Sequence, residues 1–247
     1  SIFDVANCGI GEVSAVWVYV EPEADLTLDD IESNLCAITG NSAYVNPNIA
    51  QECIEDGCGT SAEDPFKTIT WALQMIMPSE TNETTIYLAN GTYSPETGEN
   101  FPIILPSYVN LQGAGEDLTI LDAEQTAKVM EIRYVVENSI LDLTITGGYS
   151  DVYSMGAGIT IKWAYGVQLH NLSIIDNEGR NGAGLYAYFA EFHLINSLIE
   201  NNRAPYTLDD GMGGAMYINS SNFIVIDCII SNNINAPVYV AISNGGF

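Results

Sequence analysis

A repeat in the second half of the chain constrains the fold more than any other feature. Three hydrophobic six-residue runs, beginning at Leu169, Leu194 and Val225, align without gaps at offsets of 25 and 31 residues, and a weaker copy begins at Ile140. Each later copy follows a glycine-rich element and closes on two polar turn residues. A unit of about 25 residues with two or three short strands has the size of one solenoid rung. The sequence therefore predicts an all-β chain, a right-handed parallel β-helix with its repeats clearest over residues 140–247.

Polar residues recur at two positions of the repeat where the coil should turn. In a parallel stack each rung supplies one residue to every column, and Asn suits such columns because it tolerates a left-handed backbone and its amide both donates and accepts. We therefore interpret both columns as structural ladders and not as a binding site. The members are Asp142, Asn171, Asn196 and Asp227 in one column, and Asn177, Asn202 and Asn233 in the other.

Alternation along the first strand of each rung predicts which side chains point outward. The outward set includes Tyr186, Tyr188 and Tyr217, and the aligned rungs place no carboxylate beside them. Such a face argues against a lyase or glycoside hydrolase site, which needs acids or a base placed together. The tyrosines are candidates for stacking on sugar rings, because aromatic rings have flat apolar faces and a polar tip. The alternative is that they stabilise neighbouring strands by stacking on one another.

Acidic residues from the turns of adjacent rungs form the one candidate metal site. Asp176, Glu200, Asp209 and Asp210 could converge and supply the several oxygen ligands that calcium requires. The alternative is a solvated acidic edge with loose arginine pairs. Calcium is therefore a possible ligand, and no cofactor is predicted.

The charge balance excludes two classes of partner. Six Lys and Arg residues face thirty-two Asp and Glu residues, which gives a formal net charge of −26. Such a chain repels phosphate backbones and anionic lipids, so nucleic acid is not expected as a partner. The sequence has no apolar run long enough to span a membrane, for which about 18 residues are needed. Glycans, surface proteins and other copies of the chain remain as candidate partners.

The cysteines indicate an oxidising compartment. Cys53 and Cys58 flank a turn-forming run and could close a small disulfide loop, and Cys8 and Cys36 could form a second disulfide. Cys228 lies in an apolar run, where a free thiol behaves as a small hydrophobic group. A zinc site is the competing interpretation, but no matching second cysteine pair supports it. An extracellular or cell-surface location follows from the two expected disulfides.

The first sixty residues differ in composition from the rest. They contain four of the five cysteines, so we expect a cysteine-containing segment over 1–60 and the β-helix over 61–247. Ile69, Leu73 and Ile76 fall on one stripe at helical spacing. A helix over about 66–77, ending before a proline, is therefore predicted; its role as a cap is implied by the resemblance described below.

The last residues begin another rung. A strand-like run at 238–242 is followed by the final glycines and Phe247, with no helix or charged run to cover the edge. An open strand edge invites pairing. We expect either that the natural chain continues past Phe247 or that this edge docks on another subunit, end to end.

Four short motifs occur in order over about residues 60–125. They are Pro65-Phe66-Lys67-Thr68-Ile69, Asn90-Gly91-Thr92-Tyr93-Ser94, Gly98-Glu99-Asn100-Phe101-Pro102-Ile103 and Val109-Asn110-Leu111-Gln112-Gly113. Together they resemble the opening of a family of secreted β-helix proteins of unknown function, in which a helix caps the N-terminal end of the solenoid. The later rungs resemble pectate-lyase-like β-helix proteins. The Gly213-Gly214-Ala215-Met216 element is similar to repeats of polymorphic outer-membrane adhesins.

Two functional hypotheses follow. The first is a non-enzymatic structural, adhesive or assembly module of a secreted or cell-surface protein. The second is a carbohydrate-binding module or a polysaccharide-degrading enzyme of the pectate-lyase-like type. It would use the tyrosine face or the loop that contains Asp209 and Asp210.

Overall fold

The computed structural model describes most of the chain beyond its first 39 residues, namely residues 40–53, 57–151, 153–205, 213–235, 237–241 and 244–246. Cys8 and Cys36 lie outside these ranges, so the second predicted disulfide stays a prediction. Asp209 and Asp210 of the candidate calcium site also lie outside them.

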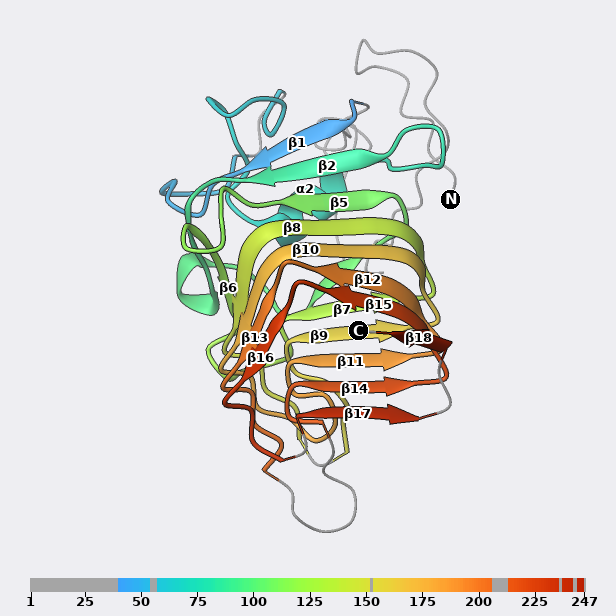
Figure 1. Cartoon of the computed structure of the whole chain (residues 1–247). Helices are drawn as coiled ribbons and strands as arrows, with labels where there is room; N and C mark the ends of the chain where they lie inside the picture. Colours follow the sequence, from blue (N-terminus) through green and yellow to red (C-terminus); the bar gives the residue numbers. More distant parts are fainter. Residues whose placement is uncertain are drawn as a thin grey trace, which may run out of the picture.

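The chain winds into a stack of rungs in which every pair of neighbouring named strands is parallel (Figure 1). One side of the stack is a six-stranded sheet, which contributes one short strand from each rung. In stack order its strands are β4 (Ile103–Leu105), β7 (Met130–Arg133), β9 (Ile159–Lys162), β11 (Leu185–Tyr188), β14 (Met216–Asn219) and β17 (Val238–Ala241).

The other sides belong to a twelve-stranded sheet. Its main path runs through β1 (Ser42–Val45), β2 (Thr84–Leu88), β5 (Val109–Gln112), β8 (Val136–Thr146), β10 (Tyr165–Ile175), β12 (Glu191–Ile195), β15 (Asn222–Ile226) and β18 (Asn244–Gly246). Four short strands extend it around a bend, namely β3 (Gly91–Tyr93), β6 (Thr119–Asp122), β13 (Leu198–Glu200) and β16 (Ile229–Ser231).

That bend divides the larger sheet into two faces. β8 and β10 are 11 residues long and pass through the bend without a break. They turn at Asp142 and Asn171, whose φ angles of 56° and 51° lie in the left-handed region. In the next rung the turn at Asn196 separates β12 from β13. A full rung therefore has three strands.

The registers confirm the predicted repeat. Leu169 pairs with Leu194, and Leu194 pairs with Val225, as the offsets of 25 and 31 residues require. The weaker copy of the repeat is in the same register, because Ile140 pairs with Leu169. The parallel β-helix predicted from the sequence is therefore confirmed.

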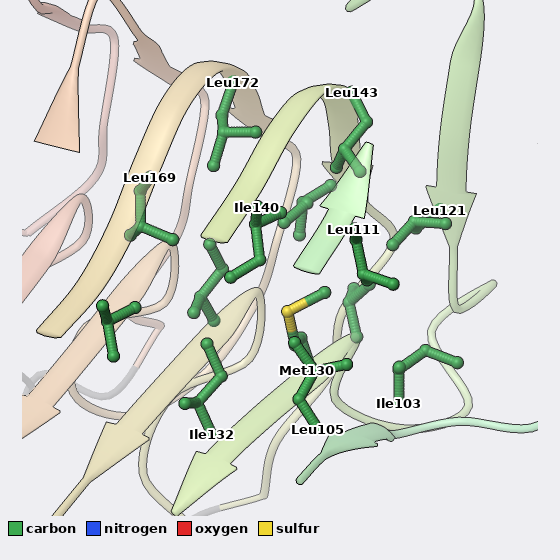
Figure 2. Close-up of a cluster of buried hydrophobic side chains, with 14 of the residues drawn as sticks. Ile103, Leu105, Leu111, Leu121, Met130, Ile132, Ile140, Leu143, Leu169 and Leu172 are labelled. Carbon is green, nitrogen blue, oxygen red and sulfur yellow. The ribbon is translucent and has the colours of Figure 1, made fainter. Parts of the chain in front are cut away.

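Inward-pointing aliphatic side chains fill the interior of the coil. Figure 2 shows Leu111, Ile140 and Leu169 of the larger sheet facing Met130 and Ile132 of the smaller one. All five are fully buried. Truncation of one such side chain to alanine typically costs about 2–5 kcal/mol, so these columns supply much of the stability.

The glycine-rich elements lie where three of the rungs enter the six-stranded sheet, before β9, β11 and β14. Gly156, Gly182 and Gly213 have φ angles of 72°, 62° and 68°, a backbone conformation that residues with a Cβ rarely adopt. At Gly184 a Cβ would lie 2.7 Å from the carbonyl oxygen of Ala215 in the next rung. Glycine therefore recurs in this element from rung to rung because the backbone conformation and the close packing of neighbouring rungs require it.

Helix α2 (Ile69–Met75) packs against β1 and β4 and buries Ile69 and Ala72. Its N-terminus is satisfied by carboxylates from distant segments. Glu99 accepts from the backbone amide of Ile69 at 2.6 Å, and Glu52 accepts from the hydroxyl of Thr68 at 2.8 Å. Acidic groups at this end stabilise a helix through its unpaired N–H groups and its dipole. The predicted capping helix is present, although it is shorter than expected because Ile76 is already extended.

The predicted Cys53–Cys58 disulfide is confirmed, with the two Cα atoms 5.8 Å apart. Upstream of it, β1 pairs in parallel with β2, so the sheet begins before residue 61, where the sequence placed its start. A boundary drawn from cysteine content alone missed this strand. Within the described ranges, no helix is long and apolar enough to cross a membrane.

Candidate functional site

The outward residues of the six-stranded sheet form two columns that run from rung to rung. The first column, in stack order, consists of Ile104, Glu131, Thr160, Tyr186, Tyr217 and Tyr239. The second consists of Arg133, Lys162, Tyr188, Asn219 and Ala241. The parallel register thus places side chains from successive rungs next to one another, and the predicted tyrosines lie on this face.

The prediction that this face carries no carboxylate is wrong, because the sheet contains a rung that the repeat did not reveal. β7 pairs directly with β9 and places Glu131 beside Thr160. β7 escaped notice because no glycine-rich element precedes it. Two signals could have found it. Apolar and charged residues alternate over 130–133, and Met130 precedes its partner Ile159 by the same 29 residues that separate Ile140 from Leu169.

Glu131 is held between two basic side chains. One of its carboxylate oxygens lies 3.1 Å from Nζ of Lys128, and the other lies 3.2 Å from Nη2 of Arg133. The Lys128 and Glu131 side chains are largely buried, whereas the Arg133 side chain is 48% exposed. Partial burial strengthens such pairs relative to fully exposed ones. Arg133 is therefore anchored at one end and still presents N–H groups to solvent.

Lys162 completes this group. It pairs in register with Arg133, and its Nζ lies over the Tyr186 ring, 5.1 Å from the ring centroid. Burial lowers the pKa of Lys162, and the positive charges of Lys128 and Arg133 lower it further against the opposing effect of Glu131. The ammonium group of Lys162 therefore lacks a full counter-charge.

We call Lys128, Arg133 and Lys162, together with Glu131, the cation cluster. It contains three of the six basic residues of a chain whose formal net charge is −26. Three positive groups around one carboxylate favour the binding of a second anion. The planar guanidinium group of Arg133 is suited to a carboxylate, which it can bind through two parallel hydrogen bonds.

The tyrosine column is packed ring on ring. Tyr186 and Tyr217 stack with centroids 5.4 Å apart and Tyr217 and Tyr239 with centroids 4.8 Å apart. Lys162 covers part of the other face of Tyr186, and burial raises the pKa of that phenol to about 12. The faces of Tyr186 and Tyr217 that would stack on a sugar are thus covered by neighbouring rungs. Stacking of sugars on these tyrosines stays a prediction, and the geometry favours the alternative of strand stabilisation.

The outer ladder lies at the bend of the larger sheet. Asn171 donates from Nδ2 to Oδ1 of Asp142 at 2.7 Å, and Asn196 donates to Oδ1 of Asn171 at 2.8 Å. These three residues and Asp227 have φ angles between 48° and 56°. We call these four positions the Asn corner. Asp142, Asn171 and Asn196 are thus joined from rung to rung by side-chain hydrogen bonds. That the column has no role in binding stays a prediction.

The second ladder is buried inside the turn. Asn177 donates to Oδ1 of Asn202 at 2.9 Å, and Asn202 donates to Oδ1 of Asn233 at 3.0 Å. The sequence-based reason for Asn here needs correction. The left-handed residue in each rung is the preceding one, for example Asp176 with a φ of 54°, and the buried Asn instead satisfies backbone groups such as the carbonyl of Ile175.

The candidate calcium residues are only partly described. Asp176 occupies an exposed left-handed turn position, and Glu200 accepts hydrogen bonds from Ser231 at 2.7 Å and Asn232 at 2.9 Å. In the part of the chain that the structure describes, no three His, Cys, Asp or Glu side chains are grouped to hold a metal ion. Calcium binding that includes Asp209 and Asp210 stays a prediction.

Solved structures with the same architecture are known. Pectate lyase Pel9A matches with a TM-score of 0.53 and 17% identity over 85% of this chain and 56% of that chain. A rhamnogalacturonan lyase matches with a TM-score of 0.44 and 12% identity, over 84% of this chain and 58% of that chain. The chain thus spans less than two thirds of the length of either lyase. At 17% identity, the likeness to the pectate lyase shows the fold alone.

Sequence comparison identifies the family. No curated protein sequence matches the chain. Residues 53–244, which include α2, the cation cluster and both ladders, match the family described as "Protein of unknown function (DUF1565)". This match covers most of the chain. The chain therefore belongs to the DUF1565 family of parallel β-helix proteins.

Proposed function

We propose that this chain is a non-enzymatic adhesive module of a secreted or cell-surface protein, and that it binds acidic polysaccharide on the outer face of the six-stranded sheet. The cation cluster carries the proposal. Arg133 and Lys162 lie side by side on neighbouring strands, and a single carboxylate offsets the three basic groups. A uronate carboxylate would supply the missing negative charge.

The location rests on the disulfide. Disulfides persist in oxidising compartments, so the Cys53–Cys58 bond supports a secreted or surface-exposed module. The acidic remainder of the chain does not prevent local anion binding, because charges further away than about 8 Å are largely screened at physiological ionic strength. It does select against polyanions that would cover much of the surface, such as nucleic acid.

A second candidate function is cleavage of the same polysaccharide. The lowered pKa of Lys162 favours it, because a partly neutral amine beside bound anionic sugar could act as a general base. The match to lyases in fold is compatible with either function. We favour binding, because Glu131, the carboxylate of the cation cluster, is held between two basic groups and is poorly placed to act as an acid–base partner of Lys162.

Affinity electrophoresis in gels that contain polygalacturonate, alginate or neutral dextran tests the proposal. The wild-type chain should be retarded by the acidic polymers and not by dextran. Arg133→Gln should weaken the binding about tenfold, since a charge-assisted hydrogen bond contributes roughly 1.5–3 kcal/mol. Arg203→Gln is the matched control, because Arg203 is 54% exposed and pairs with Glu178 at 3.3 Å away from this face.

Equal retardation of both variants would contradict the assignment of the site. The same samples should also be incubated with each polymer and assayed for new reducing ends and unsaturated sugars. No product is expected. Product formation that is abolished in Lys162→Met would overturn the non-enzymatic part of the proposal and establish cleavage instead.

A further inference from the structure

The coil leaves the six-stranded sheet through a second corner with a left-handed backbone. The φ angles of Tyr134, Trp163 and Phe189 are 58°, 54° and 47°, and Ser220 continues the column at 50°. Bulky side chains are rare in this region because the Cβ approaches the carbonyl oxygen. The Asn corner meets the same backbone requirement with short polar residues. The turn therefore does not require an aromatic residue at this position in three successive rungs.

Backbone hydrogen bonds alone close this corner. The amide of Tyr134 donates to the carbonyl of Lys162, and the amide of Trp163 donates to the carbonyl of Tyr188, both at 3.0 Å. The ladder between rungs would be the same with asparagine or glycine at these positions. Strained backbone that is retained without an architectural need is a reason to look for a functional one.

The rings form an ordered and exposed surface, which we call the aromatic corner and define as Tyr134, Trp163 and Phe189. Trp163 and Phe189 stack with centroids 4.4 Å apart and planes 3° from parallel. Tyr188 packs edge-on against both, with centroid distances of 5.7 and 4.6 Å. Trp163 and Phe189 are still 39% and 37% exposed, and Tyr134 is 75% exposed. Apolar surface fixed in this way is available to a ligand at little ordering cost.

The aromatic corner adjoins the cation cluster in every rung that they share. Arg133 directly precedes Tyr134, and Lys162 directly precedes Trp163. Tyr134 lies three positions after Glu131, which corresponds to roughly 10 Å along a strand. This span is longer than one sugar ring. The two groups are therefore neighbouring parts of one surface, which together is long enough for more than one sugar residue.

We infer that the aromatic corner is a second subsite, where Trp163 and its neighbours bind the apolar face of a sugar residue in the acidic chain held by Arg133 and Lys162. The inference rests on the proposed function and deepens it. The bound polysaccharide runs along the strand direction, from the cation cluster over the aromatic corner. Recognition combines carboxylate pairing at one subsite with ring stacking at the next.

A single-stranded nucleic acid also combines anionic groups with flat rings, and it is the competing ligand class. The overall charge of −26 disfavours it, because a nucleic acid carries a phosphate at every residue. A short oligothymidylate is therefore included as a probe. Binding of this probe that is tighter than binding of an oligouronide of equal length would overturn the inference.

The test is a titration of the whole chain with galacturonate oligomers of two and six residues, in which calorimetry and tryptophan fluorescence detect binding. The key variant is Trp163→Asn, which removes the ring and places at this corner a residue that suits a left-handed backbone. It should keep or raise the thermal midpoint and bind the dimer and the hexamer about tenfold more weakly, because two sugar residues already span both subsites. Hexamer binding should also change the tryptophan emission of the wild type, and this change should be lost in the variant.

Tyr87→Asn is the control, because Tyr87 is 40% exposed and stacks on Tyr44 at 5.2 Å on the larger sheet. It should leave binding of both oligomers unchanged. If Arg133→Gln weakens both oligomers while Trp163→Asn weakens neither, the inference fails and the proposed function stands. If neither oligomer binds the wild type, the proposed function fails as well. A large drop in the thermal midpoint of Trp163→Asn would show that the ring serves the fold and would overturn the inference.

Discussion

The two corners of the coil have the same backbone and different side chains. At the Asn corner, Asn171 and its column neighbours adopt a left-handed φ and join successive rungs through their amides. At the aromatic corner, Trp163 and its neighbours adopt the same conformation, and the hydrogen bonds that join the rungs come from the backbone. One corner has the residues that the turn prefers, and the other has residues that the turn disfavours.

The difference separates what the fold needs from what it tolerates. A left-handed conformation costs roughly 1–2 kcal/mol for a residue with an ordinary side chain, and less for Asn or Asp. The Asn corner avoids this cost and gains hydrogen bonds. The aromatic corner bears this cost at three rungs, and stacking of Trp163 on Phe189 offsets part of it. Among the residues that the structure describes, no ring contact of this kind involves Tyr134, whose side chain is mostly exposed.

The largest effect is expected from breaking the Asn corner. Asn171→Val should lower the free energy of unfolding by about 2–4 kcal/mol, because a β-branched residue is strained at a φ of 51° and two ladder hydrogen bonds are lost. Urea denaturation measures the change. Asn171→Gly keeps the backbone conformation and should cost about half as much. Equal losses for Val and Gly would show that strain is unimportant at this corner.

The opposite sign is expected at the aromatic corner. Tyr134→Asn should raise the free energy of unfolding by about 1 kcal/mol, because it relieves the strain at a φ of 58° and removes a ring that is mostly exposed. Differential scanning calorimetry detects the shift. Tyr165→Asn is the control, since Tyr165 is an exposed tyrosine in β10 without a left-handed φ, and should bring no gain. Destabilisation by Tyr134→Asn would mean that this ring stabilises the coil.

The third expectation concerns pH and the cation cluster beside the aromatic corner. Because the pKa of Lys162 is lowered, its ammonium form is lost at a lower pH than that of an ordinary lysine. A bound carboxylate stabilises the charged form, so affinity for oligogalacturonate should fall as pH rises through the lowered pKa. The fall should be about threefold, or roughly 0.7 kcal/mol, and calorimetric titrations over a pH series measure it.

Lys162→Met should bind more weakly at neutral pH and lose this dependence, whereas Arg203→Gln should retain it. The sign for stability is the reverse of that for binding. A base whose pKa is lowered on folding disfavours the folded state when it is protonated, so stability should rise as pH increases from the lowered pKa toward the ordinary lysine pKa of 10.5. A pH-independent affinity in the wild type would remove Lys162 from the proposed site.

The smallest effect is expected from extending the Asn corner. Asp227 has the left-handed φ of the column but carries a carboxylate, whereas the preceding rung has Asn196 at this position. Asp227→Asn would add an amide that can donate to Oδ1 of Asn196. A gain of about 0.5 kcal/mol in the free energy of unfolding is expected for an exposed hydrogen bond. Asp151→Asn, at an exposed position outside both ladders, should give no comparable gain.

Much of the fold could be predicted because the repeat is written in residues with special backbone roles. Glycine-rich elements and Asn columns marked the rungs, and alternation then placed Leu185 inside and Tyr186 on the outer face. The rung containing β7 lacks those markers and was missed, although its alternation was visible. With it the sequence analysis missed Glu131 and therefore the cation cluster.

The aromatic corner could not be found by the same means. A single aromatic residue after a strand, such as Trp163 or Phe189, looks ordinary in a sequence, and only the register shows that they form a column. Their left-handed φ angles are also invisible, because bulky residues do not signal that conformation. Likewise, alternation placed Tyr186 and Tyr217 on one face but carried no information on how their rings rotate against each other.

The direction of the strands has a consequence for how such a protein could change in size. The strands run across the long axis of the stack, so a polysaccharide that follows them crosses this axis (Figure 1). The width of one coil, and not the number of coils, then limits how many sugar residues of one polymer can contact the protein. Duplication of a rung such as the one containing β9 and β10 would create another parallel track. Growth of the solenoid would therefore raise the number of polymers held side by side and so favour crosslinking of a matrix.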